Sequence, residues 1–267
     1  MKKEYGLSIS TPNEEVFSCG LFSCIEYCKL YLNESINLDT IAAEVTILKE
    51  YSQKYNVAIR SFHLPANINE LFHFEPSSPD ESIREATFEM HKKVLDLVIP
   101  LGIELVVIHG SLRTTAEERP ARLDGLVKYL QMLCDYLKDY NIKVALETLL
   151  PSCIGNGLTE HLYIMEHAQR DNLGICFDSN HMLEEDNVNF LQHAGQYVIT
   201  THLSDFDGVY ERHWFPGRGV NDWKQIVKVM AEKGYDGPYV FEVSFKEIPA
   251  VRESFQTLIS EWEALFA

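Results

Sequence analysis

The chain has no long hydrophobic run. No segment approaches the roughly 20 consecutive apolar residues of a membrane-spanning helix. The first ten residues, MKKEYGLSIS, contain two lysines but lack the apolar stretch of a signal peptide. Both absences argue against insertion into a membrane and against export. We therefore expect a soluble, cytoplasmic protein.

Paired cysteine motifs are absent as well. The six cysteines show no CxxC spacing, so we expect free, mostly packed thiols and neither a disulfide framework nor a thiolate metal site. Low-complexity segments, charge blocks and recognisable linkers are also missing. With 267 residues and 46% hydrophobic composition the chain can bury a large core, and we predict a single domain over residues 1–267.

Basic residues are scarce relative to acidic ones. The chain has 23 lysines and arginines against 40 aspartates and glutamates, a net charge of -17. Such a surface repels phosphate backbones, which disfavours nucleic acid as a partner, although a binding site can be locally positive.

Short apolar segments alternate regularly with helical periodicity. Eight segments read as strands, at residues 5–10, 22–27, 57–63, 104–109, 142–147, 173–178, 197–203 and 238–243. Helices are predicted between and after them, at 38–55, 80–101, 116–139, 158–170, 182–194, 220–234 and 247–265. Between the first two strands there is room for only one or two helical turns. Repeated βαβ units give either a closed barrel or an open doubly wound sheet.

Six of the predicted strands end in a residue that can bind a divalent metal ion. These residues are His63, His109, Glu147, Asp178, His202 and Glu242. An open sheet gathers ligand groups from two or three strands at one switch point, whereas a closed barrel can direct groups inward from nearly every strand. The pattern therefore favours an α/β fold of the (β/α)8 TIM barrel type with a metal site at one mouth.

Glu147, Asp178, His202 and Glu242 form the chemically tightest set. Three carboxylates and one imidazole suit a hard or borderline cation, so we predict one divalent metal ion, Mn²⁺, Mg²⁺, Co²⁺ or Zn²⁺. The alternative is that these carboxylates pair with arginine or lysine. The apolar strands offer few cations nearby in sequence, and an unpaired buried carboxylate is costly, so we favour the metal.

The sequence resembles the xylose isomerase-like and endonuclease IV-like TIM barrels, a superfamily of sugar phosphate isomerases and epimerases. The resemblance covers nearly the whole chain and depends on FHLP at 62–65, VVIHG at 106–110, ALET at 145–148, FDSNH at 177–181, THLSD at 201–205, RHWFPGRG at 212–219 and FEV at 241–243. It implies that the four residues named above bind the metal, that Glu147 and Glu242 are the acid/base pair, and that His181 binds substrate.

The implied function is a metal-dependent sugar or sugar-phosphate isomerase or epimerase. A metal ion bound to a carbonyl and the adjacent hydroxyl acidifies the C–H bond between them and stabilises an enediolate. Two glutamates on opposite sides could then exchange the proton. The expected partner is a small carbohydrate, and fold analogy suggests a homo-oligomer.

Other residues at the same mouth are candidates for substrate contact. His63 and His109 could bind sugar hydroxyls or a second metal ion, or could be structural. Arg212, His213 and Trp214 follow the seventh strand, where a loop could place them over the pocket. Gly217 and Gly219 precede a helix and could offer backbone amides to an anion, although this motif is weak.

Departures from the family patterns leave alternatives open. Ketose 3-epimerases have a substrate glutamate and an arginine where this chain has Cys153 and Gly208. Endonuclease IV-like enzymes bind up to three metal ions and have an Asp-x-His pair where this chain has Glu211 and His213. Hydrolysis of abasic DNA, an inosose-dehydratase-like lyase reaction and a non-enzymatic binding barrel therefore remain alternatives.

Overall fold

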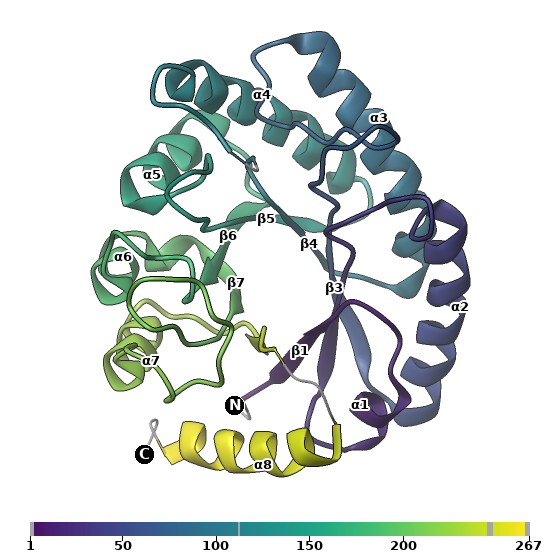
Figure 1. Cartoon of the computed structure of the whole chain (residues 1–267), viewed down its shortest axis with the longest axis vertical. Helices are drawn as coiled ribbons and strands as arrows, with labels where there is room; N and C mark the ends of the chain where they lie inside the picture. Colours follow the sequence, from purple (N-terminus) through teal and green to yellow (C-terminus); the bar gives the residue numbers. More distant parts are fainter. Residues whose placement is uncertain (1–2, 112, 245–247, 265–267) are drawn as a thin grey trace.

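The computed structural model describes residues 3–111, 113–244 and 248–264, and within them eight parallel strands alternate with helices (Figure 1). The strands are β1 (Tyr5–Ile9), β2 (Cys24–Cys28), β3 (Ala58–His63), β4 (Leu105–Ile108), β5 (Lys143–Glu147), β6 (Leu173–Asp178), β7 (Val198–His202) and β8 (Tyr239–Phe241). The helices are α1 (Glu14–Ser18), α2 (Leu38–Tyr55), α3 (Glu81–Val98), α4 (Arg119–Lys138), α5 (Gly157–Ala168), α6 (Asn187–Ala194), α7 (Trp223–Glu232) and α8 (Ile248–Ala264). Short 3-10 helices, η1 (Ile99–Leu101) and η2 (Gly195–Tyr197), follow α3 and α6.

The strand order confirms the TIM barrel and excludes the open doubly wound sheet. From β1 to β7 each strand pairs with its neighbours in the chain, and β1 also pairs with β8. Between β7 and β8 the closure is short. It consists of a bridge between Leu203 and Phe241, with bonds from Leu203 N to Val240 O (2.8 Å) and from Glu242 N to Leu203 O (3.2 Å). Figure 1 shows the helices as an outer ring around the strands.

Side-chain caps start several of the helices. Asn37, Asp80, Asp186 and Asp222 accept hydrogen bonds from backbone amides in the first turns of α2, α3, α6 and α7. Between β1 and β2 the only helix is α1, which is five residues long and capped by Asn13, as the short connecting segment predicts. No helix in the described ranges is long and apolar enough to cross a bilayer.

Several predicted boundaries at the carboxyl-terminal mouth differ from the observed ones by one to five residues. The cap Asp186 starts α6 five residues later than expected, so that residues 182–186 extend the loop after β6, which already carries Asn180 and His181. The strands β4 and β8 end one residue before His109 and Glu242. Residues 247 and 265, the ends of the last predicted helix, lie outside the described residues.

Inside the barrel, apolar side chains lie below the carboxyl ends of the strands. Leu105, Val107, Ala145 and Cys176 form a small cluster inside the strands, separate from the large core between strands and helices. Toward the carboxyl ends of the strands the interior side chains become charged and polar, although they remain buried. The fold therefore concentrates buried polar groups at one mouth.

Candidate metal centre

The parallel register brings the predicted ligands to one level. Asp178 on β6 lies beside His202 on β7, and Glu147 on β5 lies beside Cys176, two residues before Asp178. One ligand atom each from Glu147, Asp178, His202 and Glu242 can be chosen so that all lie within 4.8 Å of one another. His202 Nδ1 is 3.2 Å from Glu147 Oε1 and 3.3 Å from Glu242 Oε2. The sequence-predicted set is thus assembled in space.

Two buried atoms of this cluster have no hydrogen-bond partner in the described part of the chain. They are Asp178 Oδ2 and His202 Nδ1, on side chains with no exposed surface. Buried polar atoms are normally satisfied, and an unsatisfied pair pointing into a ring of carboxylates is a costly arrangement without a cation. Oxygen and nitrogen donors at this spacing fit a divalent metal ion.

The histidines around the mouth are oriented for ligation. One ring nitrogen of His63, His181 and His213 faces a backbone carbonyl, of Leu64 (2.9 Å), Thr148 (2.9 Å) and Glu242 (3.1 Å) respectively. A carbonyl can only accept, so each of these nitrogens carries the proton and the other nitrogen is directed toward a carboxylate. This tautomer control is typical of metal-binding histidines.

Two further groups of potential ligands adjoin the first. His63 Nε2 and His109 Nε2 lie 2.8 and 3.0 Å from Glu147 Oε2, so the two oxygens of Glu147 face different groups. Glu211 Oε1 lies 2.6 Å from His213 Nε2 and 3.5 Å from His181 Nε2. The longer arm of a glutamate at position 211 therefore still reaches both histidines.

The charges at this mouth shift the protonation equilibria strongly. Burial, together with the charges of Glu242 and Glu147, raises the pKa of Asp178 to about 7. Burial lowers the pKa of His202, but the surrounding carboxylates outweigh this and hold it well above its usual value. Burial also lowers the pKa of His213, but the hydrogen bond to Glu211 and the charges of Glu242 and Asp178 outweigh it and raise this pKa to about 9. Without a metal ion, protons on the histidines balance the carboxylates.

The loop after β7 is organised by a buried aspartate. Asp205 accepts hydrogen bonds from the backbone amides of Gly217 (2.9 Å) and Asn221 (3.2 Å) and from Trp223 Nε1 (2.9 Å). A Cβ atom on Gly219 would lie 2.1 Å from the Phe206 carbonyl oxygen, so only glycine fits there. Gly217 and Gly219 are expected to offer backbone amides to a bound anion. For Gly217 this prediction is wrong, because its amide donates to Asp205.

Arg212 and Trp214 lie on the same loop and are partly exposed. The Arg212 guanidinium pairs with Asp207 Oδ2 at 2.7 Å and lies over the rings of Tyr210 and Trp214. Asn180 Oδ1 accepts from the backbone amides of Arg212 and His213. Substrate contact by Arg212, His213 and Trp214 stays a prediction, and an incoming anion would compete with Asp207 for Arg212.

Sequence reasoning missed one buried carboxylate at this mouth. Glu26 on β2 is fully buried, and its Oε1 lies 2.8 Å from His202 Nε2. The signal in the sequence was a glutamate inside the apolar segment CIEYC, but it occupies the middle of a strand rather than its end.

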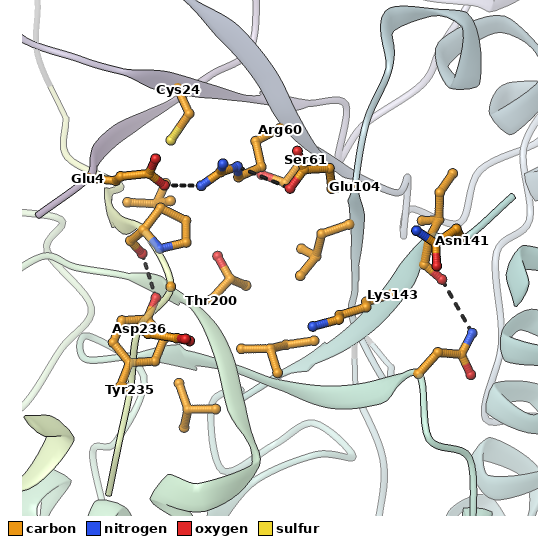
Figure 2. Close-up of a pocket in the computed structure, with 18 of the residues that line it drawn as sticks. Glu4, Cys24, Arg60, Ser61, Glu104, Asn141, Lys143, Thr200, Tyr235 and Asp236 are labelled. Atoms are coloured by element: carbon orange, nitrogen blue, oxygen red, sulfur yellow. Dashed lines mark hydrogen bonds and ion pairs between the residues drawn. The ribbon is translucent and has the colours of Figure 1, made fainter. Parts of the chain in front are cut away.

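A cavity lies at the opposite mouth of the barrel. It has a volume of about 1030 Å³ and is lined by residues at the starts of strands, among them Cys24, Leu105 and Lys143. Figure 2 shows Arg60 there between Glu4 and Glu104, with dashed lines to both. None of the predicted site residues lines it. Since catalytic groups of TIM barrels lie at the carboxyl ends of the strands, we place the candidate site at the carboxyl-terminal mouth.

Comparison with known proteins agrees with this fold. Residues 16–261 match the model of the xylose isomerase-like TIM barrel family, and the chain belongs to that family. The crystal structure of a D-tagatose 3-epimerase-like protein superposes with a TM-score of 0.79 at 21% identity, covering 99% of this chain and 100% of that one. At this level of identity the superposition supports the fold alone.

Relatives with related names match at similar levels. An inosose isomerase of Halalkalibacterium halodurans is 25% identical over 234 residues, 82% of this chain and 81% of that protein. A ketose 3-epimerase of Arthrobacter globiformis is 28% identical over 199 residues, 72% of this chain and 66% of that protein. The chain matches only about half of an uncharacterised protein of Sinorhizobium fredii, 27% identical over 165 residues, which are 60% of this chain and 53% of that protein.

Proposed function

We propose that this protein is a divalent-metal-dependent isomerase or epimerase of polyhydroxylated ketones, such as sugars or sugar phosphates. The observation that carries the proposal is the convergence of Glu147, Asp178, His202 and Glu242, with two of their buried atoms unsatisfied. The names of the relatives, a ketose epimerase and an inosose isomerase, support the same chemistry. Ketoses and inososes share a carbonyl next to a carbon that bears a hydroxyl.

The bound metal ion would polarise the carbonyl and the neighbouring hydroxyl of the substrate, which acidifies the C–H bond between them. Proton transfer is then the task of side chains. Glu242 is the more accessible of the two candidate groups, with 27% of its side chain exposed against 1% for Glu147. We assign the two glutamates to opposite sides of the substrate, so that one removes the proton and the other returns it.

The direct test is hydrogen exchange with solvent. Protein loaded with Mn²⁺ is incubated in D₂O with a panel of ketoses, aldoses and inososes, and deuterium at the carbon next to the carbonyl is measured by NMR. We expect incorporation for at least one substrate and a decrease of about 10²–10⁴-fold in Glu147→Gln and Glu242→Gln. Metal content is measured in each variant, because both residues are also proposed ligands.

A matched substitution away from the site controls for the loss of a glutamate. Glu44 on α2 hydrogen-bonds Tyr27 and pairs with Lys29, and Glu44→Gln should keep full exchange. The position of the deuterium separates the outcomes: return to the same carbon with inversion is epimerisation, and transfer to the neighbouring carbon is isomerisation. Loss of a hydroxyl would instead indicate a dehydratase. Unaltered exchange in Glu242→Gln would refute its assigned role.

One observation favours a second candidate, hydrolysis of a phosphodiester at an abasic site in DNA. The groups His63–His109–Glu147 and His181–Glu211–His213 adjoin the first cluster, and three adjacent metal ions could support such a reaction. The net charge of -17 and the pairing of Arg212 with Asp207 weigh against a DNA substrate. Nicking of an abasic oligonucleotide by the metal-loaded protein would establish this candidate.

A further inference from the structure

His202 is held differently from the other anchored histidines of the mouth. For His63, His181 and His213 the anchoring acceptor is an uncharged backbone carbonyl. For His202 it is the carboxylate of Glu26, 2.8 Å from Nε2. Both side chains have no exposed surface. Glu26 does not belong to any of the groups of potential metal ligands among the described residues.

Three donors fix the orientation of this carboxylate. Ser8 Oγ donates to Glu26 Oε1 (2.9 Å) and Ser61 Oγ donates to Oε2 (3.0 Å), while His202 Nε2 completes the set. The donors come from β1, β3 and β7, so the barrel wall itself holds Glu26 in place. A buried carboxylate satisfied in this way keeps its negative charge.

The geometry separates the two ring nitrogens of His202. Because a carboxylate accepts the hydrogen bond at Nε2, the proton of the neutral ring lies there and the lone pair lies on Nδ1. Nδ1 is the atom directed between Glu147 Oε1 and Glu242 Oε2, and it has no hydrogen-bond partner in the described residues. A charged acceptor at Nε2 also makes Nδ1 more basic, and therefore a stronger metal ligand, than a backbone carbonyl at Nε2 would.

We propose that Glu26 is a positioning residue that sets the metal affinity of the site through His202. This inference rests on the proposed function only in placing a divalent ion between Glu147, Asp178, His202 and Glu242. It assigns to the buried glutamate of β2 a role that touches neither the substrate nor the ion.

Two substitutions separate the charge of Glu26 from its hydrogen bond. Glu26→Gln keeps a neutral acceptor, which makes the support of His202 equivalent to that of the other anchored histidines. Glu26→Leu removes the acceptor at similar volume. Dissociation constants for Mn²⁺ and Zn²⁺, measured by calorimetry with a competing chelator, should rise about 10-fold in the first and about 100-fold in the second. The control Glu44→Gln should stay near the parent value.

A second measurement detects positioning directly. In the Zn²⁺-loaded protein, the proton on His202 Nε2 should give a downfield NMR signal that is protected from solvent. It should move upfield in Glu26→Gln. If Glu26→Leu does not fold, Ser61→Ala is the replacement, and it should weaken metal binding by a few fold because it removes one donor that orients Glu26.

The outcomes distinguish this inference from the proposed function. Metal affinities within about twofold of the parent in both Glu26 variants, or a lower melting temperature of the metal-free protein with unchanged affinity, would overturn the inference. If the Glu26 variants bind metal more weakly than the parent, as expected, but the parent catalyses no hydrogen exchange, the proposed function alone would be overturned.

Discussion

The two mouths of the barrel both hold acidic side chains, but with different partners. At the amino-terminal mouth, Glu4 and Glu104 flank Arg60 (Figure 2). Asp135 pairs with Arg170 there as well. At the carboxyl-terminal mouth, the buried carboxylates Glu26, Glu147 and Asp178 face histidines. Among the described residues, no ion pair joins an arginine or lysine to any of these three carboxylates.

The difference lies in whether the partner can lose its charge. Arginine stays protonated at any pH at which the protein is folded, so its carboxylates are permanently neutralised. Histidine can release its proton near neutral pH and become a ligand. A mouth lined by carboxylates and histidines can therefore exchange protons for a metal ion, whereas a mouth lined by arginine pairs cannot.

The largest effect should come from removing metal and raising the pH. In the metal-free protein, His213 and Asp178 have pKa values raised to about 9 and about 7. A group whose pKa is raised in the folded state stabilises the fold at any pH below its pKa in the unfolded chain, which is about 6.5 for histidine and about 4 for aspartate. This stabilisation is lost as the pH rises through the pKa of the folded state. Between pH 6 and 9 we expect a loss on the order of 2–3 kcal/mol, or a fall in melting temperature of roughly 5–10 °C.

Thermal unfolding at pH 6, 7.5 and 9 with EDTA and with saturating Mn²⁺ checks this prediction. The metal ion takes the place of the protons, so most of the fall should disappear when Mn²⁺ is present. Equal pH dependence with and without metal would show that the titrating histidines do not surround the ion.

A smaller effect is expected from Gly219→Ala in the loop that carries Glu211 and His213. The new Cβ would meet the Phe206 carbonyl oxygen and Asp205, so the backbone must move, at a cost of about 1–3 kcal/mol. Metal affinity should fall as well. Gly102→Ala, next to β4 at the amino-terminal mouth, is the matched control. Gly102 has φ +81 and an unobstructed Cβ position, so that variant should lose stability but keep its metal affinity.

The smallest effect is expected from Arg60→Gln at the amino-terminal mouth. Glu4 and Glu104 are 44% and 67% exposed, and exposed ion pairs contribute at most about 1 kcal/mol. Chemical denaturation at low and high salt should show a small loss that salt diminishes, while metal content stays unchanged. Weaker metal binding in this variant would mean that the two mouths are not independent.

Much of the architecture could be predicted because it depends on local patterns. Apolar segments separated by helical periodicity identified all eight strands, and their polar endings identified the four residues that converge. Parallel strands in register bring their carboxyl ends to one level, so a residue's place at the end of a strand is enough to assign it to the mouth. The same rule identified His63 and His109, which contact Glu147.

Glu26 shows why this rule is incomplete. It lies in the middle of β2, yet the register with β1 and β3 and the closure of the barrel bring it to His202, 176 residues away in the chain. The pairing of Arg212 with Asp207 and the use of the Gly217 amide by Asp205 likewise depend on how one loop folds back on itself.

The sequence by itself determined the barrel and the residue types at its carboxyl-terminal mouth, because periodicity and strand ends are properties of neighbouring residues. Only the tertiary structure decided which ring nitrogen faces the cluster, which carboxylate supports each histidine and which acidic groups find arginines. These features depend on distances between strands remote in sequence, which exist only once the barrel has closed.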